Sequence, residues 1–164
     1  MHWRAFMALS IVTIFTTPFS VAASSPTVSY PTLRLTLNGH AWQLRLTRVF
    51  STHYIGTHIS NPVTAKGKYI VLSFDALNLT KQPNDLYSDQ DFLLLDSTGR
   101  TFSIDANATG AAQAQYAPND TSQVQPSLTN HVYFAFDIAK DASHLRLLNH
   151  PYEHLARLLY ILKL

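Results

Sequence analysis

The sequence of 164 residues contains no cysteine. Disulfides and thiolate metal sites are therefore excluded, and we expect no lipid anchor of the kind that bacteria attach to an N-terminal cysteine. The composition, with 46% hydrophobic and 13% charged residues, is not that of a disordered chain. A domain of roughly 140 residues buries about two-thirds of its unfolded surface, so a sizeable core is possible without covalent links.

Residue types that carry common chemistries are also scarce. Glu153 is the only glutamate, which excludes the glutamate pair of many glycosidases and leaves an aspartate pair as a formal option. No G-x-S-x-G segment is present, and no spacing of serine, histidine and aspartate favours a catalytic triad. Met1 and Met7 are the only methionines, and both precede the expected cleavage site, which argues against a methionine-rich copper carrier. We therefore expect no enzymatic activity and no cofactor.

The first 23 residues read as a signal peptide. A short basic start, Met1–Arg4, precedes the mostly apolar Ala5–Phe19, and small residues follow at Val21–Ala23. The apolar run is too short for a comfortable membrane span of about 20 residues. We expect cleavage after the last of these residues and a secreted or periplasmic protein without a stable membrane span; the alternative is an uncleaved N-terminal anchor. The mature chain then consists of a linker at 24–31 and one domain at 32–164.

The mature part is almost neutral. It contains eleven lysines and arginines against ten aspartates and glutamates, which is a net charge of +1, and the basic residues are scattered singly. Nucleic acid is therefore not an expected partner.

The centre of the chain, Phe92–Asp105, predicts a β-hairpin. Asp96–Gly99 supplies the turn, because aspartate and serine bond to the nearby backbone and Gly99 can take a positive φ. The strand before the turn, Phe92–Leu95, is apolar on both faces, so we expect it inside a sheet, and the residues after the turn alternate strictly.

Further strands are predicted wherever apolar and polar residues alternate. They cover Leu33–Leu37, Trp42–Val49, Lys68–Leu77, His131–Ile138 and Leu145–Leu147, with a hairpin turn at Asn38-Gly39 and a brief pairing at Thr121–Val124. The segments Ser51–Lys66, Asn78–Asp91 and Ala106–Asp120 read as loops. Seven to nine short strands without βαβ alternation predict an all-β fold, an antiparallel immunoglobulin-like β-sandwich.

The last segment, Glu153–Leu164, fits two periods. Leucines at 155, 158, 159 and 162 fit a helix, whereas residues 158, 160, 162 and 164 fit a strand. We favour a strand, because every element before it is β. The alternative is an amphipathic helix on a membrane or partner, with only Arg157 and Lys163 to attract anionic lipid.

Three segments in order, KYIVLSFDALNLT, FLLLDSTGRTFSID and HVYFAFDIAKDASHLRL, resemble a bacterial family. It comprises the secreted immunoglobulin-like domains of unknown function related to the mycobacterial immunoprotective extracellular protein. The matching features are Asn78 at the end of the central strand, the D-x-x-G turn Asp96–Gly99 and the late Phe136-Asp137-Ile138 with Lys140 in the next turn; Ser127 departs from the usual glycine after proline. The resemblance implies a telokin-like β-sandwich from Leu33 onward and carries over no catalytic residues.

The histidines are the weak candidates for a metal site. His53 and His58 share one predicted loop, and His144, His150 and His154 lie near one another in the sequence. A metal site needs two or more converging imidazoles, often with a carboxylate. Exposed loop histidines with ordinary partners are the alternative.

Two further groups are candidates for binding. Asp85, Asp89 and Asp91 crowd one loop beside Asn84, although the glycine and final glutamate of a calcium loop are absent. Five tyrosines are expected in loops or on outward faces, which suits a binding surface but is equally common at sheet edges: Tyr54, Tyr87, Tyr116, Tyr133 and Tyr152.

These observations predict an exported, non-enzymatic β-sandwich that binds an unknown protein or small ligand through its loops, as an interaction module of the bacterial cell envelope or secretome. Ser51–Lys66 and Ala106–Asp120 are the expected contact regions. The alternative is an envelope metal-binding protein that uses the loop histidines.

Overall fold

The computed structural model describes residues 29–37, 39–56, 62–86, 92–121, 123–149 and 157–164. The expected signal peptide at 1–23 and most of the linker lie outside them. The elements are β1 (Thr32–Leu37), β2 (His40–Ile55), β3 (Val63–Asn78), β4 (Asn84–Asp85), β5 (Phe92–Leu95), β6 (Thr101–Ser103), α1 (Ala106–Tyr116), β7 (Gln123–Val124), β8 (Thr129–Ile138), β9 (Arg146–Asn149) and β10 (Arg157–Ile161).

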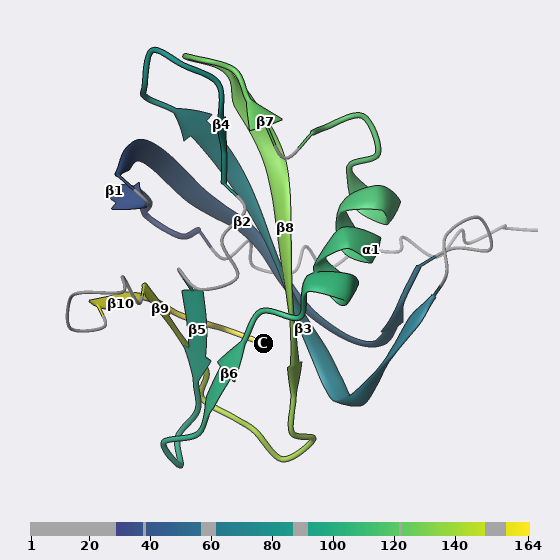
Figure 1. The fold of residues 1–164 in the computed structure, drawn as a ribbon. Coiled ribbons are helices and arrows are strands. Elements are labelled where there is room, and N and C mark those ends of the chain that lie inside the picture. The colour runs from purple at the N-terminus through teal and green to yellow at the C-terminus, as the bar shows by residue number, and fades with distance from the viewer. Residues whose placement is uncertain (1–28, 38, 57–61, 87–91, 122, 150–156) are drawn as a thin grey trace, which may run out of the picture.

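Two antiparallel four-stranded sheets form the body of the protein (Figure 1). The first has the order β1-β2-β3-β8 and the second the order β10-β9-β5-β6, while β4 and β7 form a short ribbon of their own. The predicted β-sandwich is therefore confirmed. The predicted pairing at Thr121–Val124 is confirmed as well, in β7, which pairs with a strand inside the segment Asn78–Asp91 that was expected to be a loop.

The main core lies between the two sheets, because the strands present one apolar face to each other. The largest of its fully buried side chains are aromatic: Trp42, Phe74, Phe92, Phe134 and Phe136. Phe74 and Phe92, one from each sheet, stack with ring centroids 6.3 Å apart. As expected from its two apolar faces, β3 is an interior strand, paired with β2 on one side and β8 on the other.

The predicted central hairpin is also confirmed, and Asp96 organises its turn. The Asp96 side chain is buried and accepts hydrogen bonds from the backbone N–H and hydroxyl of Thr98 and from the backbone N–H and Nε of Arg100, at 2.7 to 2.9 Å. Gly99 has the expected positive φ, 87°. Burial alone would raise the pKa of Asp96, but the hydrogen bonds from Thr98 and Arg100 outweigh it and lower the pKa to about 2.

Two segments expected to be loops form regular structure instead. Ala106–Tyr116 is the helix α1, which starts at an N-cap residue, Asp105, whose carboxylate accepts from the N–H of Ala108 at 2.9 Å. The segment Ser51–Lys66 consists largely of the ends of β2 and β3, which pair as far as Ile55 and Val63. Neither α1 nor the paired ends of β2 and β3 could be predicted from hydrophobic periodicity, because neither has a continuous row of apolar residues along one face.

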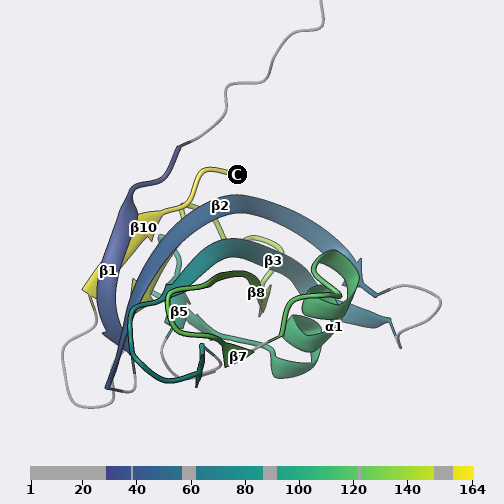
Figure 2. The ribbon, with the colours of Figure 1, turned by 90° about the horizontal axis from the view of Figure 1, so that it is seen from above.

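The helix creates a second, smaller core on the outer face of the first sheet. Ala108 and Ala112 of α1 pack with Val71 of β3 and Ala135 of β8, all fully buried. Ala135 lies on the opposite face of β8 from Phe134 and Phe136, and it is buried in this second core. Figure 2 shows β2 and β3 strongly curved, with α1 against one end of the curve. Small alanine side chains suit this close approach of a helix to a sheet.

The described part of the C-terminal segment, residues 157–164, contains a strand, as favoured from the sequence. Arg157–Ile161 pairs with β9, with one irregularity in register between Leu158 and Tyr160. The alternative of an amphipathic helix on a membrane is therefore wrong. Among the residues that the structure describes, no helix is long and apolar enough to span a membrane.

Candidate functional site

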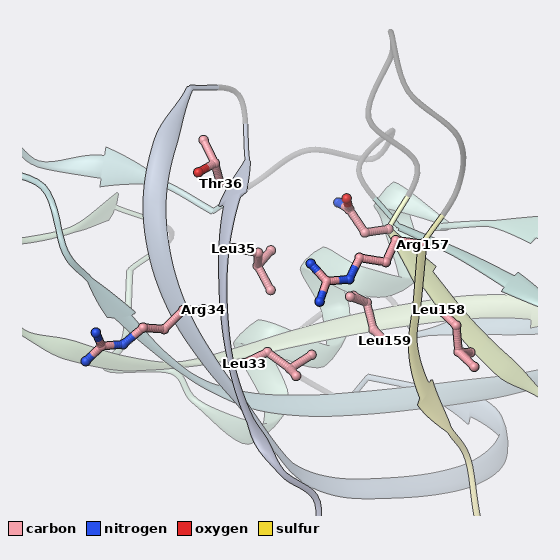
Figure 3. A pocket seen from close by; sticks show the side chains of 8 residues that line it. Leu33, Arg34, Leu35, Thr36, Arg157, Leu158 and Leu159 are labelled. Carbon is pink, nitrogen blue, oxygen red and sulfur yellow. The ribbon is translucent and has the colours of Figure 1, made fainter.

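An open groove lies where the edge strands of the two sheets face each other, β1 in the first sheet and β10 in the second (Figure 3). It has a volume of about 160 Å³. Leu33 and Leu35 point into it from β1, and Leu159 points toward them from β10. All three leucines are half-buried and pack on the main core, so the groove has an apolar floor that continues into the protein interior.

Polar residues complete the lining of the groove, namely Arg34, Thr36, Asn149 and Arg157, and one of them places a cation over the leucines. The guanidinium of Arg157 reaches from β10 toward β1 in Figure 3, whereas Arg34 points to the opposite side of β1. Arg34 donates from Nε to Gln43 at 3.3 Å. Within the described part of the chain, neither arginine forms an ion pair with a carboxylate. A groove of this kind suits an apolar group that carries a negative charge.

A tyrosine pair joins the two strands beside the groove. Tyr160 of β10 donates its hydroxyl to the carbonyl of Pro31 at 2.8 Å, and its ring meets that of Tyr30 edge-on with centroids 5.6 Å apart. The hydroxyl of Tyr30 accepts from the N–H of Lys163 at 3.2 Å. Burial raises the pKa of Tyr160, so its hydroxyl stays a donor at neutral pH. These contacts hold the start of β1 against the end of β10 and preserve the spacing of the groove.

A polar row crosses the outer face of the first sheet. Arg45, Asp75 and His131 lie opposite one another on β2, β3 and β8. Arg45 forms an ion pair with Asp75, whose other oxygen lies 2.9 Å from Nδ1 of His131. His131 was not among the candidates from the sequence, because the register of three strands brings the row together. Among the described residues, no nucleophilic side chain forms a hydrogen bond with the His131 imidazole, so the row carries no catalytic assignment.

Two of the five candidate histidines, His53 and His144, lie in the described part of the chain, and they belong to different segments. His53 lies exposed near the end of β2, and His144 lies in the turn before β9, where Nδ1 is 3.2 Å from the hydroxyl of Ser143. His58, His150 and His154 lie outside the described residues. In the described ranges no three histidine, aspartate or glutamate side chains converge as a metal site requires.

Some of the candidate aspartates and tyrosines lie in the described part of the chain. Asp85 is exposed in β4, and Asp89 and Asp91 lie outside the described residues. Tyr116 and Tyr133 pack together with ring centroids 5.4 Å apart, and Tyr116 also meets Phe50 edge-on. Tyr54 is 61% exposed, whereas Tyr87 and Tyr152 are not described. Tyr116 and Tyr133 therefore contribute to the packing around α1, and among the described candidates Tyr54 is the exposed one.

The groove residues Leu33, Leu35, Arg157 and Leu159 were not proposed as a site from the sequence. Alternation in β1 does indicate that its leucines face inward. However, β1 and β10 lie close together in space although most of the chain separates them in the sequence. A pattern of neighbouring residues cannot predict such a contact.

Comparison with known proteins identifies the fold. No protein-family model matches the sequence, and no curated protein matches it. A conserved hypothetical protein from Bacillus anthracis has a similar structure, with a TM-score of 0.56 and 12% identity over 80% of this chain and 95% of that one. The secreted protein MPT63 from Mycobacterium tuberculosis has a TM-score of 0.52 and 8% identity, over 80% and 94% of the two chains.

A third similar structure is an uncharacterized β-sandwich protein from Clostridium difficile 630, with a TM-score of 0.50 and 13% identity, over 80% of this chain and 90% of that chain. At these identities the likeness shows the fold alone. The resemblance inferred from the sequence is thereby confirmed for the fold: the protein is a β-sandwich, and a secreted mycobacterial protein is among the proteins of similar structure.

Proposed function

We propose that this protein is an exported, non-enzymatic binding module, and that the groove between β1 and β10 is its binding site. The observation that carries the proposal is Arg157, a cation without an ion-pair partner in the described chain that projects over the apolar floor of Leu35 and Leu159. The export signal in the sequence and the fold shared with a secreted protein support a site of action outside the cytoplasm.

The groove replaces the contact regions expected from the sequence. Ser51–Lys66 and Ala106–Asp120 were proposed as binding loops, but their described parts are mostly strands and a helix whose inner sides are packed. By contrast, the groove is open and combines apolar surface with a positive charge. We therefore place the ligand between the sheets and not at the loops.

Nuclear magnetic resonance of the processed protein, residues 24–164, tests the proposal. Octanoate and octylammonium serve as probes, since they share an apolar tail and differ in the sign of the charge. We expect octanoate to shift the methyl signals of Leu33, Leu35 and Leu159 and octylammonium to shift them far less. Arg157→Glu should reverse this preference, whereas Lys140→Glu, a charge change at an exposed turn after β8, should not. Equal shifts with both probes, or shifts confined to α1, would contradict the proposal.

A further inference from the structure

The outer edge of β1 forms one wall of the groove and has no strand partner in the described part of the chain. β1 is the last strand of its sheet, and its register with β2 runs without a break from Thr32 to Leu37. Pro31 precedes the strand, but no proline lies within it. A regular edge of this kind is a template for pairing with another extended chain.

The backbone groups that face this edge can be assigned. The N–H of Leu79 donates to the carbonyl of Ala41 at 3.1 Å, so Ala41 directs its backbone toward β3. Thr36 lies opposite Ala41, and in an antiparallel pair it must then direct its own N–H and C=O away from β2. By alternation, Arg34 and Thr32 do the same. The free edge thus presents the backbone N–H and C=O groups of these three residues. Their side chains lie on the outer face of the sheet, whereas Leu33 and Leu35 between them face the groove.

The other sheet edges are protected. On β8, residues of α1 and of the segment after it form hydrogen bonds with the backbone N–H and C=O groups that point away from β3. Gln113 bonds both the N–H of Tyr133 and the C=O of His131, Thr109 accepts from the N–H of Ala135, and Asp120 accepts from the N–H of His131. β6 has only three residues, and β10 has an irregular register. Short strands and bulges are the usual ways of blunting an edge, and β1 has neither.

We infer that the ligand of the groove is an extended acidic polypeptide segment that adds to β1 as a fifth strand of the first sheet. This inference rests on the proposed function and names its ligand class. An added strand pairs with Thr32, Arg34 and Thr36 through its backbone and turns alternate side chains toward Leu33 and Leu35. The volume of about 160 Å³ is below the roughly 300 Å³ of pockets that enclose a drug-sized molecule, and it suits individual side chains of a segment whose backbone stays at the edge.

Charge favours an acidic segment over a second copy of this chain. Arg34 flanks the edge on the outer face and Arg157 flanks it across the groove, so a bound strand has a positive charge on either side. Pairing of β1 with β1 of a second molecule would bring two copies of both arginines into one interface, and like charges in close cross-strand positions are destabilising. An acidic partner neutralises them instead.

The test uses the processed protein and a peptide of about eight residues in which valine alternates with glutamate and threonine. In an antiparallel pair the hydrogen-bonded residues face the same side, so glutamate and threonine lie opposite Thr32, Arg34 and Thr36, and their amides face β1. N-methylation of the glutamate and threonine amides should weaken binding by at least about tenfold, because it removes these hydrogen bonds. N-methylation of the valine amides, which point away from β1, is the matched control and should leave the affinity within about twofold.

Protein variants complete the test, with affinity measured by calorimetry. Arg34→Glu should weaken the peptide and strengthen its counterpart in which lysine replaces glutamate, whereas Lys140→Glu should change neither. Arg157→Glu should weaken a second peptide in which glutamate replaces one valine on the groove side, because Arg157 projects into the groove. If both N-methylated peptides bind equally, or if β1 instead mediates a concentration-dependent dimer, strand addition by an acidic segment is wrong. Should octanoate still shift the groove leucines in that case, the proposed function stands; loss of both responses would remove both.

Discussion

The side-chain amide of Gln113 on α1 occupies the place of a strand beside Tyr133 on β8. Its Oε1 accepts from the N–H of Tyr133 at 3.1 Å, and its Nε2 donates to the carbonyl of His131 at 3.0 Å. A backbone peptide group of a neighbouring strand makes the same two kinds of bond. Gln113 therefore covers the part of this edge between the residues that Thr109 and Asp120 bond, and the three side chains together keep it from pairing with other chains.

Replacing Gln113 should both destabilise the fold and expose this edge. We expect Gln113→Ala to lower the free energy of unfolding by about 1 to 3 kcal/mol, because it leaves the partly buried N–H of Tyr133 and the more exposed carbonyl of His131 without this partner. Urea denaturation measures the loss, and light scattering measures the added tendency to aggregate. Gln123→Ala, at an exposed position of β7, is the control and should stay within about 0.5 kcal/mol of the parent. An equal effect of the two variants would contradict the role of Gln113.

The pKa of Asp96 predicts an acid-sensitive hairpin. Since the pKa in the folded protein is lowered to about 2 from the ordinary 3.8, the folded state favours the ionised carboxylate. Its contribution to stability is therefore present in full above about pH 4 and is lost as the pH falls toward 2. We expect Asp96→Asn to be less stable than the parent at pH 7 and to show a weaker loss of stability between pH 4 and pH 2.

The control for this experiment is Asp141→Asn. Asp141 shares the partner Arg100, with Nη1 and Oδ1 3.1 Å apart, but its side chain is 75% exposed. An exposed pair of this kind contributes about 0 to 1 kcal/mol, so the variant should keep nearly all of the parent's stability and pH dependence. Thermal unfolding at a series of pH values distinguishes the two aspartates, and matching profiles would show that burial of Asp96 is unimportant.

Ser127 predicts a stabilising substitution. Gln125 accepts from the N–H of Leu128 at 3.1 Å across a turn in which Ser127 has a φ of 59°. The third position of a type II turn after proline needs a positive φ, which favours glycine. We expect Ser127→Gly to raise the free energy of unfolding by about 0.5 to 1 kcal/mol, because strain relief exceeds the added entropy of the unfolded chain.

Ser103→Gly serves as the opposite case. Ser103 is exposed in β6, where extended backbone suits any residue, so glycine there should lower stability by about 0.5 to 1 kcal/mol. Chemical denaturation of both variants gives the two signs directly. If Ser127→Gly were destabilising like Ser103→Gly, the conclusion that Ser127 has a strained left-handed backbone conformation would be wrong.

Asn78 should be among the least replaceable polar residues. Its buried side chain donates to the carbonyls of Gln82 and Val124, both at 2.8 Å, and accepts from the N–H and hydroxyl of Thr80. We expect Asn78→Ala to lower the free energy of unfolding by about 2 to 4 kcal/mol, because several buried groups lose their partners. Asn107→Ala, at an exposed position of α1, should change it by less than about 0.5 kcal/mol. Comparable melting temperatures for the two variants would contradict this role.

The sequence by itself determined the features that depend on neighbouring residues. Alternation with a period of two identified the central parts of the long strands, because each strand must bury one face, and Asp96 with Gly99 identified the central turn. These features are local, since the chemistry that produces them lies within a few residues of the chain.

Only the tertiary structure decided the helix and the groove. α1 has no apolar stripe of its own, and Gln113 and Thr109 hold it on the edge of β8 by bonds to residues 20 and 26 positions further along the chain. The N-cap at Asp105 is a local signal for this helix. Likewise, Leu35 and Arg157 line the same groove only because the two sheets pack with the edge strands β1 and β10 facing each other. Contacts between distant segments depend on how whole layers pack, and no pattern within one segment specifies them.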